Sequence, residues 1–153
     1  MSKTFQVEIG GKVRPLRFHQ RDAIELKKRF NETPHRLLFM RCLGLDFAAV
    51  EPGESPRMDP ALFDPEVQFA VIHKAILRGG WSVTEDALIN AVDEAIQKSE
   101  GKLSFGDFVA PAVYCAFYSG AITGQQVDLQ EGKANEDAPP ASDEGNAPAS
   151  GNP

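Results

Sequence analysis

Start and stop signals for helices divide the middle of this chain into short segments, and they constrain its fold more than any other feature. Thr33-Pro34 and Asp64-Pro65 each place a capping side chain directly before a proline, which is the arrangement preferred at a helix N-terminus. Gly44 and Gly79-Gly80 stand where the apolar repeats stop, and glycine adopts the left-handed conformation that ends many helices. These signals predict one helix between Thr33 and Gly44 and another between Asp64 and Gly80.

Apolar residues at helical spacing predict an earlier helix, from about Gln20 to Phe30. Ala23, Ile24 and Leu26 share one side of it with Phe30, and charged residues lie opposite. A helix with this pattern buries its apolar side against the rest of the domain. We therefore expect all four apolar residues to face the core.

A fourth helix is predicted after Trp81, which stands at the junction with the preceding helix. Ser82 and Glu85 have the spacing of a capping box, and Thr84 is a rival N-cap. Both alternatives begin the same helix, and Gly101 ends it.

The last predicted helical segment, Leu103 to Gly124, is distinguished by an uncharged run. No Asp, Glu, Lys or Arg occurs from Phe108 to Ile122, so we expect this helix to be covered nearly all round. Pro111 either kinks the helix or begins its main segment, because proline lacks the N–H that a helix interior needs.

The N-terminal part of the chain predicts a β-hairpin. Residues 5–9 alternate apolar and polar side chains, and Gly10-Gly11 accepts the positive φ angles of a tight turn. Residues 12–18 return, but Val13 is out of phase and Pro15 cannot donate a hydrogen bond. A bulge or an outer edge near Arg14-Pro15 would explain both observations.

The predicted fold is mainly α with a short N-terminal β-hairpin, in a compact helical bundle of about five helices. The domain covers residues 1–124 and includes a Pro-rich loop at 45–63, which is long for a compact domain. Residues 125–153 are rich in Pro, Ala, Gly and acidic residues, which predicts a disordered tail. No apolar run is long enough to span a membrane, and no signal peptide is indicated, so we expect a cytoplasmic protein.

Residues capable of catalysis or metal binding are scattered. His19, His35 and His73 fall on different predicted elements, and none has a second ligand at metal-binding spacing. Cys42 and Cys115 lie in apolar helical patterns, where free cysteine usually acts as a small buried hydrophobic residue. A Cys115 nucleophile with a histidine base is conceivable, but an apolar helix disfavours its thiolate. We expect no metal, no cofactor and no enzymatic activity.

Charge is distributed unevenly along the chain. Residues 1–41 contain ten Lys/Arg and four Asp/Glu, residues 42–125 contain five and twelve, and residues 126–153 contain one and six. A basic segment of this kind can bind nucleic acid, and its densest run is Lys27, Lys28 and Arg29. The acidic remainder of the chain disfavours that function, so we expect this run to serve a protein partner or self-association.

Residues 9–124 resemble the tail assembly chaperone families of long-tailed phages, especially the gene transfer agent type. Three stretches carry the resemblance. The family's opening strand and first helix are similar to "PLRFHQRDAIELKKRF", and its helix, glycine break and capped next helix are similar to "AILRGGWSVTEDALINAVDEAI". Its closing small-residue helix is similar to "YCAFYSGAITG". It implies a protein that coats the tape-measure protein in the bacterial host cell and helps tail tube subunits to assemble around it. The alternatives are a minor structural tail component, such as a tube or connector protein, and a nucleic-acid-binding protein.

The uncharged last helix is the predicted partner-binding element. Val109, Val113, Ala116 and Phe117 are assigned to its core side. Tyr114 and Tyr118 lie four residues apart on another side, and tyrosine suits interfaces because its ring packs while its hydroxyl stays hydrated. We expect Tyr114, Tyr118 and Trp81 to border the partner groove, and the alternative is that both tyrosines pack inside the core.

Overall fold

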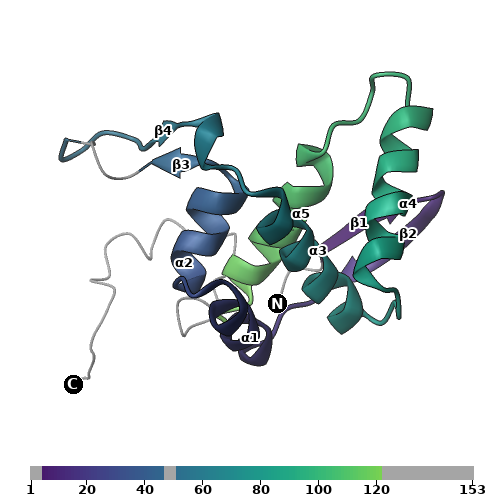
Figure 1. The fold of residues 1–153 in the computed structure, drawn as a ribbon, viewed down its shortest axis with the longest axis horizontal. Coiled ribbons are helices and arrows are strands. Elements are labelled where there is room, and N and C mark those ends of the chain that lie inside the picture. The colour runs from purple at the N-terminus through teal and green to yellow at the C-terminus, as the bar shows by residue number, and fades with distance from the viewer. Residues whose placement is uncertain (1–4, 47–50, 122–153) are drawn as a thin grey trace.

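The computed structural model describes residues 5–46 and 51–121, and it confirms a mainly α domain with an N-terminal β-hairpin (Figure 1). Its α-helices enclose most of the core, and the hairpin lies along one side. The elements, in chain order, are β1 (Phe5–Ile9), β2 (Lys12–Leu16), α1 (Gln20–Phe30), α2 (Pro34–Arg36), the π-helix η1 (Leu37–Cys42), β3 (Leu45–Asp46), β4 (Arg57–Met58), the 3-10 helix η2 (Pro60–Leu62), α3 (Pro65–Gly79), α4 (Glu85–Lys98) and α5 (Gly106–Tyr118).

The hairpin has the two-residue turn that its sequence predicts. Gly10 and Gly11 adopt φ angles of 64° and 80°, and the register runs from Ile9 opposite Lys12 to Phe5 opposite Leu16. The register between these pairs is continuous, so the outer-edge explanation of Pro15 holds and the bulge is wrong.

The alternation of hydrogen-bonded pairs in the hairpin explains why it tolerates a proline. Ile9 and Lys12 flank a two-residue turn, where the first hydrogen-bonded pair forms. Alternation then makes Pro15, opposite Gln6, a residue whose N–H would point away from β1. Val13 lies on the outer face and is 57% exposed, which is why it is out of phase with the core residues.

α3 is the central helix of the domain and packs against α1, α4, α5, η1 and β2. It begins where Asp64 accepts a hydrogen bond from the Glu66 N–H at 3.0 Å, and it ends at Gly80 with φ 115°. These are the predicted start and stop signals. Its most deeply buried residues include Val71, Ile72, Ala75 and Ile76.

α1 has the predicted ends, but its buried side is different. Ile24 is 53% exposed, whereas Asp22 is only 3% exposed. The Asp22 carboxylate accepts hydrogen bonds from the His19 N–H and from Arg78 of α3, at 2.9 Å to Nη2. This ion pair allows a charged side chain to occupy the buried side of the helix. The expectation that Ile24 faces the core is therefore wrong.

The segment predicted as a loop at 45–63 contains regular structure at both ends. β3 and β4 pair with Leu45 opposite Met58, and η2 follows directly. Residues 47–50 lie outside the described residues, as do residues 125–153, for which a disordered tail is predicted.

The helix before residues 45–63 begins at the predicted Thr33 cap and continues into η1. There the buried Gln68 amide donates to the Cys42 carbonyl at 3.0 Å.

α4 and α5 resolve two alternatives that the sequence left open. Thr84 is the N-cap of α4, because its hydroxyl accepts from the Ala87 N–H at 3.1 Å. Pro111 lies inside α5 rather than at its start. α5 packs on α3, η1 and the hairpin. From Phe108 to Ala121 every residue is buried or half-buried except Tyr114, which is 49% exposed. The expectation that this helix is covered nearly all round is therefore confirmed over these residues, with Tyr114 as the exception.

Candidate functional site

A row of aromatic rings runs from the hairpin across α5 to the second helix. Tyr118 stacks on Phe5 of β1 with ring centroids 6.1 Å apart, and it meets Phe117 edge-on at 5.1 Å. Phe117 meets Phe39 of η1 at 5.6 Å, and Phe39 contacts His35 at 4.8 Å. We call these five residues the aromatic row. Its four aromatic side chains besides His35 are half-buried, so each ring has one side against the domain and another toward solvent.

Tyr114 extends the exposed aromatic surface along α5. It lies one helical turn before Tyr118 and is 49% exposed, whereas Val113 and Ala116 on the predicted core side are completely buried. This distribution matches the predicted core side, with the exception of Phe117, which is half-buried in the aromatic row. Tyr114 is therefore outside the core, and Tyr118 is at its margin.

Trp81 contacts the hairpin through the other strand. The Arg14 guanidinium of β2 lies 3.9 Å from the centre of the Trp81 ring, a geometry that attracts a cation to an aromatic face. Tyr118 contacts β1 instead. Trp81 and Tyr118 thus approach the hairpin through different strands, and Trp81 has a local role in joining the α3–α4 junction to β2.

The three predicted basic residues separate into two kinds. Lys27 and Lys28 are exposed and form no ion pair with any residue in the described part of the chain. Arg29 donates to both carboxylate oxygens of Glu85, at 2.9 and 3.1 Å, and to Glu66 at 3.3 Å. Arg29 thereby joins α1 to α3 and α4, so part of this basic run stabilises the fold.

Replacing Arg29 by glutamine should weaken the domain at neutral pH and leave it almost unchanged in acid. Hydrogen bonds from Arg29 lower the pKa of Glu85 below its ordinary value of 4.5. A lowered pKa stabilises the folded state above that ordinary value, and the stabilisation is lost as pH falls through the lowered pKa. We expect R29Q to cost at most about 1 kcal/mol of unfolding free energy near neutral pH, because the pair is partly exposed.

Urea unfolding at neutral pH and again well below pH 4.5 tests this dependence. The matched control is K28Q, which removes an exposed neighbouring charge that forms no ion pair within the described residues. An equal loss for R29Q at both pH values would contradict the assigned role of the Glu85 carboxylate.

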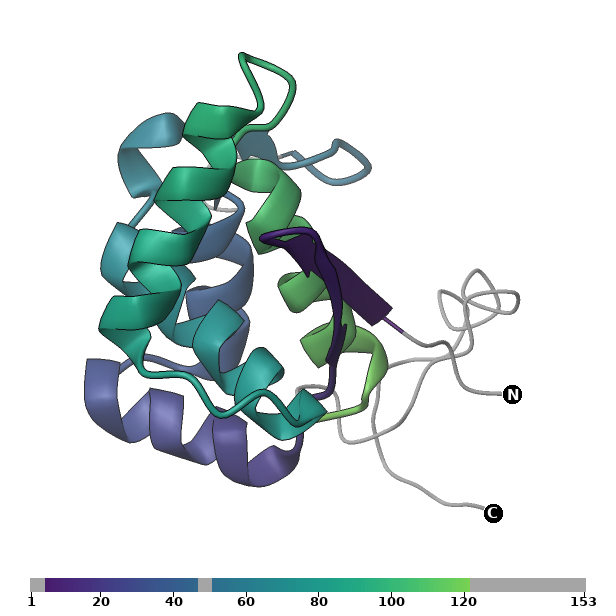
Figure 2. The same ribbon diagram turned by 90° about the vertical axis from the view of Figure 1, so that its right-hand side faces the viewer.

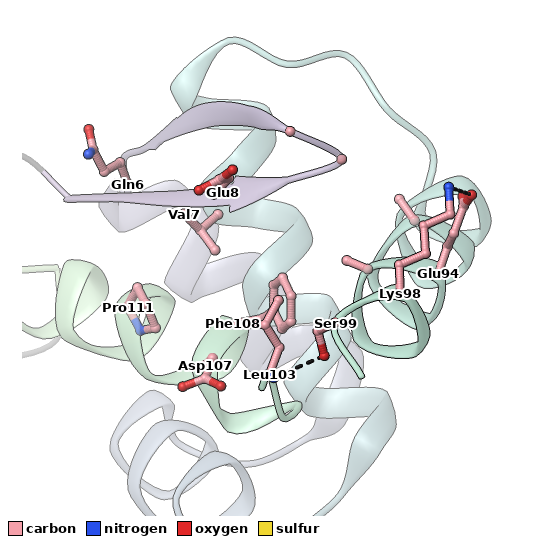
Figure 3. Close-up of a pocket in the computed structure, with 14 residues that line it drawn as sticks. Gln6, Val7, Glu8, Glu94, Lys98, Ser99, Leu103, Asp107, Phe108 and Pro111 are labelled. Atoms are coloured by element: carbon pink, nitrogen blue, oxygen red, sulfur yellow. Dashed lines mark hydrogen bonds and ion pairs between the residues drawn. The ribbon is translucent and has the colours of Figure 1, made fainter. Parts of the chain in front are cut away.

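A groove lies between β1, the C-terminal half of α4 and the beginning of α5 (Figure 3). Its volume is about 720 Å³. The apolar part of its lining consists of Val7, Ala91, Ala95, Leu103, Phe108 and Pro111. No sequence spacing pointed to this groove, because β1 is far in the sequence from α4 and α5.

Acidic residues predominate among the charged residues that line the groove. They are Glu8, Glu94 and Asp107, against the single lysine Lys98. Lys98 is paired with Glu94 at 2.7 Å, and Asp107 accepts a hydrogen bond from the Ser104 N–H at 2.8 Å. Glu8 forms no ion pair with a described residue. The groove therefore carries a net negative charge, and Glu8 of β1 and Asp107 of α5 are its carboxylates without an ion-pair partner among the described residues.

Both cysteine thiols lie in surroundings that disfavour the thiolate. Burial raises the pKa of the Cys115 thiol to about 12, and burial also raises the pKa of the Cys42 thiol. A thiol with a raised pKa is a poor nucleophile at neutral pH, because the thiolate is the reactive form. Within residues 5–46 and 51–121, no three His, Cys, Asp or Glu side chains are grouped so that they could hold a metal ion. No helix in those ranges is long and apolar enough to cross a bilayer.

Comparisons with known proteins add no further constraint on the site. A scan of family models finds no match to this chain, and searches of curated proteins and of solved structures find no match either.

Proposed function

We propose that this protein is a tail assembly chaperone of the phage or gene transfer agent type, which binds the tape-measure protein during tail assembly. The observation that carries the proposal is the exposed aromatic surface of α5, formed by Tyr114 and the adjoining aromatic row. The same helix has no charged residue after Asp107. A surface of this kind is suited to an apolar segment of another protein.

Two features of the aromatic surface support a binding role rather than a purely structural one. Aromatic side chains provide large contact areas and are enriched among residues that dominate binding energy. Tyr114 leaves about half of its surface in water although the opposite side of α5 is completely buried. An amphipathic segment of a tape-measure protein, placed across α5, would bury Tyr114 and the outer edge of Tyr118. Tail tube subunits are a second expected partner.

Truncating Tyr114 should abolish partner capture without unfolding the domain. We expect Y114A to lose less than about 1 kcal/mol of folding stability, because the ring is half exposed. Y118A should lose more, about 2 kcal/mol, because its ring also stacks on Phe5. The measurement is co-purification of each variant with a co-expressed tape-measure protein, combined with thermal unfolding.

The control for this experiment is I24A, which shortens an equally exposed apolar side chain on α1. Capture at the level of the unmodified protein by Y114A, Y118A and I24A alike would reject α5 as the partner surface.

Two further observations separate the alternative functions. A minor structural tail component would remain in purified particles, whereas a chaperone would leave them. Nucleic-acid binding at physiological salt that disappears when Lys27 and Lys28 are neutralised would favour a nucleic-acid-binding protein instead.

A further inference from the structure

The outer edge of β1 carries backbone groups that no other strand in residues 5–46 and 51–121 uses. In the hairpin register, Val7 and Ile9 exchange hydrogen bonds with β2, so the N–H and C=O groups of Gln6 and Glu8 point away from β2. Neither residue forms a backbone hydrogen bond to any described residue outside the hairpin. An edge of this kind is a template for another strand.

The opposite edge of the hairpin is closed, so the two edges differ. A Cβ atom built on Gly79 of α3 would lie 1.9 Å from the Pro15 carbonyl oxygen, which shows how closely the helix approaches β2. Just beyond β2, the Arg17 N–H donates to the Ala75 carbonyl of α3 at 3.1 Å. Pro15 itself offers no N–H. Within the described part of the chain, strand addition is therefore blocked at β2 and open at β1.

The groove lies on the open side. Three consecutive β1 residues, Gln6, Val7 and Glu8, line it, and no residue of β2 does. Figure 3 shows Val7 pointing from β1 toward the space beside Pro111 and Phe108 of α5. A strand added beside β1 would therefore have room, and its side chains on the Val7 face would meet an apolar surface.

Charge selects the kind of strand that fits. Side chains of the added strand would alternate between the apolar Val7 face and the face that carries Glu8. Glu8 has no ion-pair partner among the described residues, and Asp107 adds to the negative charge of the groove, whereas Lys98 offsets the charge of Glu94. A second copy would bring the same carboxylates into the groove. Residues 126–153 contain six acidic residues against one lysine, so the chain's own C-terminal part is also disfavoured.

We propose that β1 and this groove bind an extended segment of a partner protein, which adds a third strand to the hairpin and alternates apolar with basic side chains. Main-chain hydrogen bonds to Gln6 and Glu8 provide affinity, and the alternating side chains provide specificity. The inference goes beyond the proposed function and does not rest on it, because the aromatic surface of α5 is a different part of the molecule.

Synthetic peptides test the proposal on the full-length protein. A short peptide of alternating valine and lysine should bind, and a peptide with glutamate in place of lysine should not. N-methylation of alternate amides in the lysine peptide removes the N–H groups that would face β1. It should weaken binding by about tenfold or more. The dissociation constants would be measured by fluorescence anisotropy, and equal affinity for the methylated peptide would overturn strand addition.

Protein variants locate the site. Q6P removes one outward N–H at a position of the kind that Pro15 occupies across the hairpin, so it should reduce binding about tenfold while the thermal midpoint changes little. E8K should reverse the preference between lysine and glutamate peptides. The matched control is D93K, which makes the same charge change on α4 outside the groove lining. Unchanged binding by E8K, or concentration-dependent dimerisation that displaces the peptide, would overturn the assignment.

Discussion

Replacing Gly79 by alanine is expected to destabilise the domain by about 3 kcal/mol, at the upper end of the effects seen for overpacking. The added methyl group would lie 1.9 Å from the Pro15 carbonyl oxygen and 2.7 Å from its carbon. Both atoms belong to the backbone, so no side-chain rotation relieves the clash. α3 and the hairpin would have to separate at their closest approach. For a domain of this size we expect the thermal midpoint to fall by more than about 10 °C.

Gly106 supplies the control for this substitution. It lies at the start of α5, and the nearest atom to a Cβ built there is the Ser104 oxygen at 3.8 Å, an ordinary contact distance. G106A should therefore be neutral or stabilise the domain by up to about 1 kcal/mol. Thermal unfolding of both variants is the measurement. A G79A protein as stable as G106A would show that α3 does not approach β2 as closely as described.

The predictions that succeeded depend on local sequence. A cap such as Thr33 or Asp64 acts on N–H groups two or three residues away, and a Gly-Gly turn needs only its own two φ angles. These features are visible in a short window of sequence. Gly79 illustrates the opposite case. The sequence indicates only that a helix ends there, whereas its close approach to Pro15 joins residues that are far apart in the chain.

The errors in the predicted core also arise from contacts between residues that are far apart in the chain. Ile24 looked apolar enough to be buried, but the domain covers the side of α1 that carries Asp22, whose partner Arg78 lies in another helix. Periodicity also could not show which elements pack around α5. The absence of charge predicts that its side chains are covered, and Tyr114 is the exception.

The candidate surfaces were predictable to different extents. The position of Tyr114 away from the core side was predicted because tyrosines one helical turn apart in an uncharged helix are visible in the sequence. Its connection to Phe39 and His35 through the aromatic row was not visible, because that row requires the packing of η1 against α5. The groove beside β1 was missed entirely. Glu8, Glu94 and Asp107 share no spacing, and the open strand edge is a property of how α3 covers only β2.

Replacing Phe108 by alanine should produce the largest loss among side-chain truncations in the domain, about 3–5 kcal/mol. Phe108 is 1% exposed and heads the group of largest fully buried side chains. It lies on α5 and lines the same groove as Val7 of β1, and Figure 2 shows the hairpin beside that helix. Its removal would enlarge the groove inward and take away contacts that hold β1 against α5.

Leu103 provides the comparison that separates the core from the groove. It lines the same groove but is 37% exposed and lies between α4 and α5. L103A should cost less than about 1 kcal/mol, because water already reaches part of its side chain. Urea unfolding of both variants measures the difference. If F108A costs as little as L103A, then Phe108 contributes to the groove lining only, and the core beneath β1 is held by other residues. A large loss for F108A alone would instead show that the floor of the groove is part of the domain core, and that its outer rim can change without unfolding the protein.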